Sequence, residues 1–239
     1  MKADAAIGII GAMESEICRL ASLLENANKV HLCNMTFYTG TIGKRKVVMV
    51  KSGIGKVNAA RCTQLLIDRF SPDAIINSGI AGGIDPALSV GDIIIGTGLL
   101  QHDFDVTAFG HAKGYLCTGN DHNSPTVFYA DERLAYALES AAISQFPEKR
   151  VERGTIATGD LFVSDSGKKR ELRETFKVSA AEMEGAAIAQ TASYAGVPFA
   201  VLRVISDQAD GKAAQSFETF EKETARLSSV VIEALLNII

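Results

Sequence analysis

The sequence predicts a single α/β domain, residues 1–239, in which helices flank a mixed central β-sheet. Short apolar runs alternate with amphipathic segments from one end of the chain to the other, which is the pattern of an α/β protein. The first run, 6–10, is continuously apolar, as expected of a strand whose sheet is covered by helices on both faces. The sequence has no linker, repeat or break in composition that would divide this domain.

The elements of the first half follow from the spacing of apolar residues. A helix is predicted from about Glu14, with Ile17, Leu20 and Leu24 on one face. Two further runs, joined by a turn around Gly43, have the pattern of a hairpin. The predicted segments are a strand at 6–10, a helix from 14, hairpin strands at 35–40 and 46–52, a helix at 57–70 and a strand at 73–78.

The second half continues the alternation after one long loop. Residues 107–125 are rich in Gly, His, Asn, Thr and Ser, and loops of this length in compact domains are usually functional or mobile. Gly196 and Pro198 supply the residues that end a helix. The predicted segments are strands at 91–97, 151–158 and 199–205, and helices at 131–145, at 184–195 and from 216 to the end.

Composition and charge exclude several classes of function. The formal net charge is −4 and the sequence pI is about 5.6, which argues against nucleic acid or an anionic membrane as a partner. No apolar run approaches the ~20 residues of a membrane span, and the N-terminus does not have the pattern of a signal peptide. The four cysteines form no CxxC pair and have mostly apolar neighbours, which predicts reduced, structural thiols. We therefore expect a soluble, cytoplasmic protein.

A glycine cluster at Gly79, Gly82 and Gly83 follows a predicted strand. It matches neither of the common phosphate-binding patterns, GxGxxG and GxxxxGK[ST]. Two interpretations remain open. The glycines form a tight turn that needs positive φ, or they form a backbone that a flat ligand approaches so closely that a Cβ would obstruct it.

The histidines and cysteines give weak signals for chemistry. His102, Asp103 and Asp105 have the residue types of a metal site, but one histidine and two acids at this spacing fit a hydrogen-bonded strand end better. A GxSxG elbow is absent, so a serine nucleophile has no support. Cys62 falls in the middle of a predicted helix and is expected in the core. We expect neither a metal ion nor a cofactor.

Acidic residues at predicted strand ends give the strongest signal. Glu182 and Glu184 flank Met183, and the alternation of an extended strand would turn both carboxylates toward the same side. Asp207 follows the apolar run 199–205, at the edge where open α/β sheets bind ligands, and Glu16 follows the first strand and its Gly-Ala-Met-Glu turn. Each acid alone is compatible with a solvated surface group or a helix cap. Together they are what an acid–base enzyme acting on a sugar needs, because a buried carboxylate must be paired, protonated or bound to a ligand.

Eight segments give the chain a resemblance to the 5′-methylthioadenosine/S-adenosylhomocysteine nucleosidases, a family of the nucleoside phosphorylase superfamily. They are IGIIGAMESE (7–16), KSGIGKVNAA (51–60), INSGIAGG (76–83), VGDI (90–93), DVTAFG (105–110), TGDLFV (158–163), EMEGAA (182–187) and RVISD (203–207). The resemblance covers nearly the whole chain and implies a nucleoside phosphorylase-like fold. It also implies cleavage of an N-glycosidic bond that releases adenine from a 5′-thio-substituted ribose.

The resemblance assigns roles to the three acids. Asp207 would be the general acid that protonates N7 of the leaving adenine, and Glu16 the general base that activates the attacking water. Glu184 would accept hydrogen bonds from the 2′- and 3′-hydroxyls of the ribose, an interaction that strengthens as the sugar gains positive charge. Because an ordinary aspartate is almost fully ionised at pH 7, the acid role requires burial or a shared proton to raise the pKa of Asp207.

The resemblance also implies contacts around the nucleoside. Glu182 and Arg203 would support the water and Glu184, and Phe162 would stack on adenine. Phe109 would reach the 5′-alkylthio pocket from a second subunit, which implies a homodimer. Further binding roles are carried over to Gly82, the backbone of Val163 and Met183 at the nucleoside, and to Ile54, Met13 and Phe217 around the 5′ group.

One residue departs from the family pattern. Ile80 occupies the place of a serine whose hydroxyl would help position the acid or the water. A hydrogen bond to a charged group contributes about 1.5–3 kcal/mol in general, but losing it also raises the pKa of the acid and partly compensates. Ile80 therefore bears on rate and fine specificity more than on reaction class.

Three alternatives remain at this point. A phosphorolytic relative would bind phosphate through arginines and a Ser or Thr, but the matching places hold Glu16, Asn77 and Ile80. A hydrolase of another adenine nucleoside, such as aminofutalosine, fits the loosely specified 5′ pocket. A non-catalytic nucleoside sensor would be expected to lack at least one of Glu16, Glu184 and Asp207, and all three are present.

Overall fold

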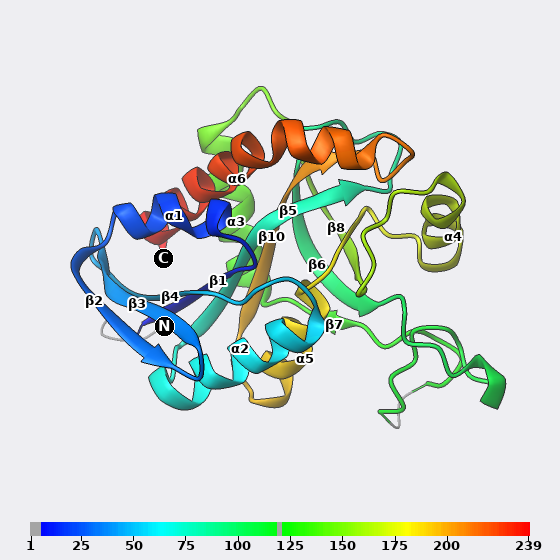
Figure 1. The fold of residues 1–239 in the computed structure, drawn as a ribbon, viewed down its shortest axis with the longest axis horizontal. Helices are drawn as coiled ribbons and strands as arrows, with labels where there is room; N and C mark the ends of the chain where they lie inside the picture. The colour runs from blue at the N-terminus through cyan, green and yellow to red at the C-terminus, as the bar shows by residue number, and fades with distance from the viewer. Residues whose placement is uncertain (1–5, 119–120) are drawn as a thin grey trace.

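A mixed β-sheet runs through the centre of the protein, and the candidate site lies at the ends of several of its strands (Figure 1). The computed structural model describes residues 6–118 and 121–239. Within these residues the strands are β1 (Ile7–Gly11), β2 (Glu25–Leu32), β3 (Met35–Ile42), β4 (Arg45–Lys51), β5 (Ala74–Gly83), β6 (Ile93–Gln101), β7 (Phe128–Tyr129), β8 (Val151–Thr158), β9 (Ala180–Glu182) and β10 (Phe199–Asp207).

The sheet is open at one end and closed at the other. Its path is β10-β6-β8-β9-β5-β1-β4-β3-β2, and β10 also pairs with β5, so that β5, β9, β8, β6 and β10 close into a barrel. The pairs β1–β4, β1–β5, β5–β10, β6–β8 and β8–β9 are parallel, whereas β6–β10, β5–β9 and the β2–β3–β4 ribbon are antiparallel. The predicted mixed α/β sheet is confirmed.

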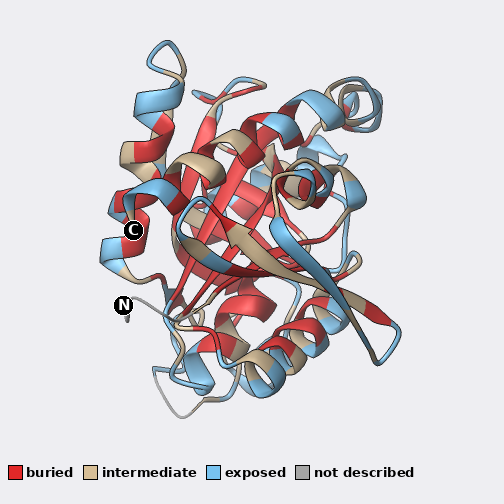
Figure 2. Ribbon diagram, turned by 90° about the vertical axis from the view of Figure 1, so that its left-hand side faces the viewer, coloured by how far each residue is buried: buried red, intermediate tan, exposed pale blue. Residues whose placement is uncertain are grey.

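Helices cover both faces of this sheet. They are α1 (Glu14–Ser22), α2 (Lys56–Phe70), α3 (Glu132–Gln145), α4 (Ser166–Phe176), α5 (Gly185–Tyr194) and α6 (Ala213–Ile238). On one face α6 packs against α1 and α3, and on the other α2 packs against α5 (Figure 1). The central strands are buried between these layers, while the outer helix surfaces and β2 are exposed (Figure 2).

Several elements of this fold were not predicted from the sequence, and the two longest are β2 and α4. Strand β2 has an almost wholly exposed ENANKVHL sequence, and it exists because its backbone pairs with β3. Helix α4 is highly polar, since only Leu172 and Phe176 are buried, and it begins where the Asp165 carboxylate accepts a hydrogen bond from Lys168 N at 2.8 Å. Neither segment has the apolar periodicity by which the other elements were recognised.

The glycine cluster lies inside a strand. β5 continues through it to Gly83, and Gly79, Gly82 and Gly83 all lack positive φ, so the tight-turn interpretation is wrong. Among the cysteines, Cys62 is buried as predicted, but the other three are exposed, so the expectation that they have apolar surroundings is also wrong. All four thiols are free.

The described part of the chain contains neither a membrane-spanning helix nor a group of three or more potential metal ligands. At the weak metal pattern, Asp103 accepts hydrogen bonds from Lys56 Nζ and Asp160 N, and Asp105 accepts from Thr107. The imidazole of His102 is buried, and a Cβ on Gly159 would lie 2.3 Å from its Nε2. These contacts give both aspartates a structural role at the end of β6.

Candidate active site

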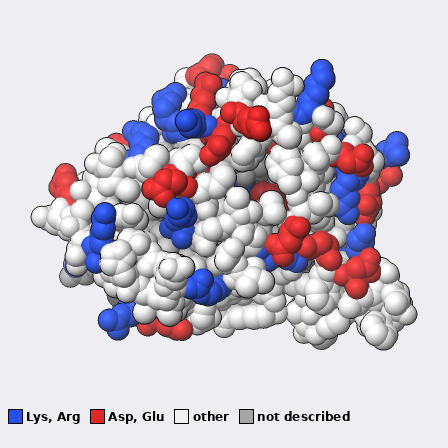
Figure 3. All heavy atoms as spheres, in the orientation of Figure 1, with Lys and Arg blue, Asp and Glu red and all other residues white. Residues whose placement is uncertain are grey.

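A cavity at the ends of β1, β5, β9 and β10 brings the predicted acids together. Its volume is about 100 Å³. The face of the molecule drawn in Figure 3 is hollowed near its middle, with acidic side chains close to the hollow. The cavity is lined by Ala12, Met13, Glu16, Ile54, Ile80, Ala81, Gly82, Phe162, Ala181, Glu182, Met183, Glu184, Ser206, Asp207 and Phe217.

Two predicted contact residues lie just outside this lining, and one lies apart. Val163 lines a smaller adjoining cavity of about 30 Å³, which shares Gly82 and Asp207 with the first. Arg203 is buried next to the cavity, where it contacts Glu182. Phe109 belongs to a short 3-10 turn (Thr107–Phe109), is 79% exposed, and does not line the cavity within its own chain.

Glu16 is held by three backbone donors where β1 passes into α1. Its Oε2 accepts hydrogen bonds from Ala12 N at 2.6 Å and Met13 N at 3.0 Å, and its Oε1 accepts from Ile80 N at 3.1 Å. Burial raises the pKa of Glu16, while the charge of Arg203 and the three N–H groups oppose that rise. Glu16 is therefore fixed in orientation and retains a stronger affinity for a proton than an exposed glutamate has.

Gly79 makes room for this carboxylate. A Cβ at that position would lie 2.7 Å from Glu16 Oε1 and 3.4 Å from Arg203 Cζ. Gly82 does the same for the second acid, because its Cβ would lie 3.0 Å from Asp207 Oδ1. The groups that approach Gly79 and Gly82 in the structure are the protein's own acids, and the approach of a flat ligand to this backbone stays a prediction.

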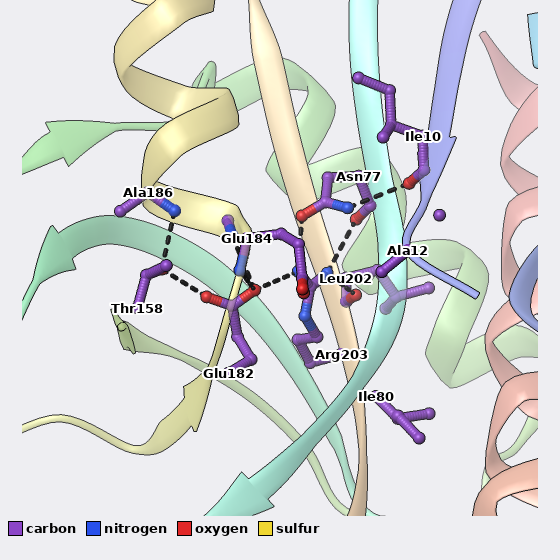
Figure 4. Close-up of polar contacts among 12 residues, drawn as sticks. Ile10, Ala12, Asn77, Ile80, Thr158, Glu182, Glu184, Ala186, Leu202 and Arg203 are labelled. Carbon is purple, nitrogen blue, oxygen red and sulfur yellow. Dashed lines mark hydrogen bonds and ion pairs between the residues drawn. The ribbon is translucent and has the colours of Figure 1, made fainter. Parts of the chain in front are cut away.

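Glu182, which lines the cavity, forms a buried ion pair with Arg203 (Figure 4). Glu182 also accepts from the Thr158 hydroxyl, from Glu184 N at 3.1 Å and from Gly185 N at 2.7 Å. Arg203 Nη2 donates to Asn77 Oδ1 at 2.6 Å. Both charges are thus paired and hydrogen-bonded, which is the condition for keeping them in the interior.

Glu184 lies where β9 passes into α5 and faces the same cavity. Its Oε1 accepts a hydrogen bond from Gly55 N at 2.8 Å. Burial, reinforced by the negative charge of Glu182, raises the pKa of Glu184 to about 8, against the opposing effects of Gly55 N–H and Arg203. Burial and the neighbouring Glu182 therefore favour the neutral form of this carboxyl group.

Asp207 ends β10 and is almost completely buried. Its Oδ1 accepts from Ala209 N at 2.8 Å, and its Oδ2 lies 2.8 Å from Ser206 Oγ, which is 3.3 Å from Ala81 O. Burial raises the pKa of Asp207, and the hydrogen bonds from Ala209 N and Ser206 Oγ oppose that rise. When Oδ2 is protonated, it can donate to Ser206 Oγ while the serine hydroxyl donates to Ala81 O, so the site accommodates the neutral acid without an unpaired group.

Sequence comparison places the chain in a known family. Residues 6–239 match the family model described as the phosphorylase superfamily. The chain is 44% identical to the 5′-methylthioadenosine/S-adenosylhomocysteine nucleosidase of Anoxybacillus flavithermus, over 97% of both proteins. The chain belongs to this nucleosidase family. The resemblance inferred from the sequence motifs is confirmed.

Solved structures of the family share the same architecture. The nucleosidase of Neisseria meningitidis, in complex with methylthio-immucillin-A, superposes with a TM-score of 0.92 at 41% identity, covering 98% of this chain and 100% of that one. A futalosine hydrolase of Helicobacter pylori superposes with a TM-score of 0.91 at 32% identity, covering 98% of both chains. The same fold therefore occurs in a methylthioadenosine/S-adenosylhomocysteine nucleosidase and in a futalosine hydrolase.

Two polar residues of the site were given no role by sequence reasoning. Thr158 is buried and links the two sides of the β9–α5 junction, donating to Glu182 and accepting from Ala186 N at 2.7 Å. Ser206 is the hydroxyl next to the acid. Both are polar residues within or at the end of apolar strands, and this is the signal by which they could have been found.

Proposed function

We propose that this protein hydrolyses the N-glycosidic bond of 5′-methylthioadenosine and S-adenosylhomocysteine, and of 5′-deoxyadenosine, to release adenine and the 5′-substituted ribose. The observation that carries this proposal is the placement of Glu16, Glu184 and Asp207 around one cavity, each buried and with a raised pKa. Membership of the nucleosidase family supports the choice of substrate.

Asp207 acts as the general acid in this mechanism. Its raised pKa keeps a larger share of the carboxyl group protonated than in an exposed aspartate, and Ala209 N and Ser206 fix its direction. Proton donation to N7 neutralises the charge that adenine would otherwise carry away from the sugar. Such a transfer contributes about 10²–10⁴ in rate.

Glu16 acts as the general base on the attacking water. Three backbone N–H groups hold its carboxylate, and desolvation makes it more basic than an exposed glutamate. The charge of Arg203 lowers the pKa of Glu16 and so favours the ionised carboxylate that can accept the proton, while Glu182 forms an ion pair with Arg203.

Glu184 recognises the ribose in its ionised form. Two donating hydroxyls favour the carboxylate over the neutral acid, so substrate binding lowers the pKa of Glu184 from its ligand-free value of about 8. Substrate binding therefore favours release of this proton. The negative charge then faces the sugar as it becomes cationic in the transition state.

Apolar residues enclose the two ends of the nucleoside. The rings of Phe162 and Phe217 meet edge to face, with centroids 5.7 Å apart, at the wall of the cavity. Phe162 stacks on adenine, next to Gly82, Val163 and Met183. Met13, Ile54 and Phe217 surround the 5′-alkylthio group.

The charges at the cavity favour water over phosphate as the nucleophile. Among the described residues that line it, the charged groups are carboxylates, and Arg203 is already paired with Glu182. A phosphate anion would meet repulsion there without a free cation to bind it. An aminofutalosine-type substrate is the second candidate, because the chain superposes closely on a futalosine hydrolase.

The test measures adenine release from 5′-methylthioadenosine by the purified protein, with and without added phosphate. We expect adenine and free methylthioribose at equal rates in both buffers. A requirement for phosphate with a sugar 1-phosphate product would contradict the role of Glu16. Faster cleavage of aminofutalosine than of methylthioadenosine would favour the second candidate.

The working form is proposed to be a homodimer in which Phe109 reaches the neighbouring site. Phe109, Val57 and Tyr194 are 79%, 78% and 66% exposed, and Val57 and Tyr194 line an open groove of about 730 Å³ between α2 and α5. Large exposed apolar side chains of this kind mark association surfaces.

Mixing two inactive variants tests the shared site. Phe109→Ala lacks the aromatic ring that it should give to its partner, and Asp207→Asn lacks the acid. After subunit exchange, the mixed dimer contains one intact site, so activity should return to about one quarter of the wild-type level. Absence of recovery, with exchange verified, would contradict the shared site.

The cellular setting is also a proposal. The four free cysteines suit a reducing compartment, which supports a cytoplasmic location. The products, adenine and a 5′-thioribose, suit methionine salvage and the recycling of S-adenosylmethionine by-products. Cell fractionation with an antibody against the protein would check the location.

A further inference from the structure

A closed ring of three hydrogen bonds joins two walls of the cavity and has no role in the mechanism above. Lys56 Nζ donates to Asp103 Oδ1 at 2.6 Å, and Asp103 Oδ2 accepts from Asp160 N at 2.9 Å. Asp160 Oδ1 accepts from Lys56 N at 2.8 Å and completes the ring. The ring ties together the start of α2, the end of β6 and the loop that follows β8.

The ring lies next to residues that contact the substrate in the proposed mechanism. Lys56 directly follows Gly55, whose N–H donates to Glu184. Asp160 is two residues before Phe162, on the wall assigned to adenine. The ring therefore links the segment that holds the ribose-recognising carboxylate to the segment that stacks on the base.

Asp160 supplies the cap that α2 does not have. Gly55 occupies the N-cap position with φ of 97° and has no side chain with which to cap the helix. Asp160 fills this role from a distant part of the chain, and a Cβ on Gly55 would lie 3.0 Å from its Oδ1. Two carboxyl groups thus share one helix N-terminus, since Asp160 accepts from Lys56 N and Glu184 accepts from Gly55 N.

Two side chains of the ring are partly buried, whereas Asp160 is exposed. Those of Lys56 and Asp103 are 18% and 27% exposed, so their ion pair is less screened than one at the surface. Lys56 Nζ also donates to Gln101 Oε1 at 3.0 Å, and Gln101 Nε2 donates to Gln190 Oε1 of α5 at 2.7 Å. The ring is thereby connected to the helix that begins immediately after Glu184.

We propose that Lys56, Asp103 and Asp160 are positioning residues that aim Glu184 at the ribose hydroxyls through Gly55 N–H. Asp160 holds the first turn of α2, Asp103 and Lys56 hold Asp160, and Gly55 N–H consequently points at Glu184 Oε1. This inference rests on the proposed function of Glu184. It makes recognition of the sugar depend on residues that do not touch it.

The test compares two substrates, 5′-methylthioadenosine and its 2′-deoxy analogue. The ratio of their kcat/KM values reports the contribution of the 2′-hydroxyl. Asp160→Ala removes the cap, so the ratio should fall by about tenfold to a hundredfold, since misplacement of about 1 Å has effects of this size. Asp160→Asn retains an oxygen that accepts from Lys56 N, and it should keep a ratio near the wild-type value.

The matched control is Asp131→Ala. Asp131 caps α3 by accepting from Arg133 N and Leu134 N, both at 3.0 Å, and it does not line the cavity. Its removal should lower Tm and leave the substrate ratio unchanged. The oligomeric state of each variant is measured by sedimentation, because Lys56 and Asp160 also border the α2–α5 groove.

The possible outcomes separate the two proposals. An unchanged kcat/KM ratio in an active Asp160→Ala variant would overturn the inference and leave the proposed function intact. An equal fall of this ratio in Asp160→Asn and Asp160→Ala would have the same meaning. A wild-type protein that hydrolyses neither substrate would overturn the proposed function and this inference with it. A selective fall of the ratio in Asp160→Ala alone would support both.

Discussion

Replacing Asp207 with asparagine should abolish most of the activity without weakening the fold. Asparagine has the same shape, its Oδ1 can still accept from Ala209 N, and its amide can donate to Ser206 Oγ. What the substitution removes is the proton that the acid transfers. We expect kcat/KM to fall by about 10²–10⁴, which corresponds to about 2.7–5.4 kcal/mol of transition-state stabilisation.

The effect on stability should have the opposite sign. Burial raises the pKa of Asp207 above its ordinary value of 3.8, so the unfolded chain releases this proton at lower pH than the folded one. Folding stability is therefore lost as pH rises from the unfolded toward the folded pKa, and it stays reduced above that range. Asparagine carries no such penalty. The variant should match the wild type in acid and become the more stable protein as pH rises.

Two assays on the same preparations test the acid role of Asp207 and its raised pKa. Adenine release gives kcat/KM, and urea unfolding at several pH values gives the free energy of unfolding. A variant with more than about one tenth of wild-type activity would refute the acid role, because the smallest expected loss is about a hundredfold. A variant that is less stable than the wild type by more than about 1–2 kcal/mol of unfolding free energy at neutral pH would refute the pKa argument.

The remaining predictions concern the other buried groups. Glu184→Gln should gain stability over the wild type as pH rises from about 4.5 to about 8 and then level off, because the pKa of Glu184 is raised to about 8; urea titrations at pH 5, 6.5 and 8 measure this gain. Gly79→Ala places a Cβ 2.7 Å from Glu16 Oε1, so kcat/KM should fall about tenfold to a hundredfold. Arg203→Met leaves Glu182 as an unpaired buried charge and should cost about 3–5 kcal/mol of unfolding free energy, measured by denaturant titration.

Two of these predictions have a matched control. Gly211→Ala should be nearly neutral, because nothing lies within 4 Å of an added Cβ at that position. Glu182→Gln combined with Arg203→Met removes both charges and should recover part of the stability lost by Arg203→Met alone. A double variant as unstable as the sum of the two single ones would contradict the ion-pair argument. A flat pH dependence of the Glu184→Gln difference would contradict the pKa of about 8.

Much of the fold was predictable because its signals are local. The apolar run at β1 and the helical spacing of α2 identify these elements without knowledge of their neighbours. Strand β2 could not be found in this way, because it exists through pairing with β3 rather than through burial of its own side chains. The role of the glycine cluster in β5 could not be predicted for a related reason. The glycines make room for Glu16 and Asp207, which approach from other elements.

The sequence by itself determined the family, the α/β alternation and which acids stand at strand ends. The tertiary structure alone decided their chemical state. Glu182 pairs with Arg203, 21 residues away, and Glu16 accepts from the backbone of Ile80, 64 residues away. A pKa depends on desolvation and on the nearest charges, and both are fixed by which strands lie side by side. Residue types and their order can therefore name the acids, but only the folded sheet determines which of them holds a proton.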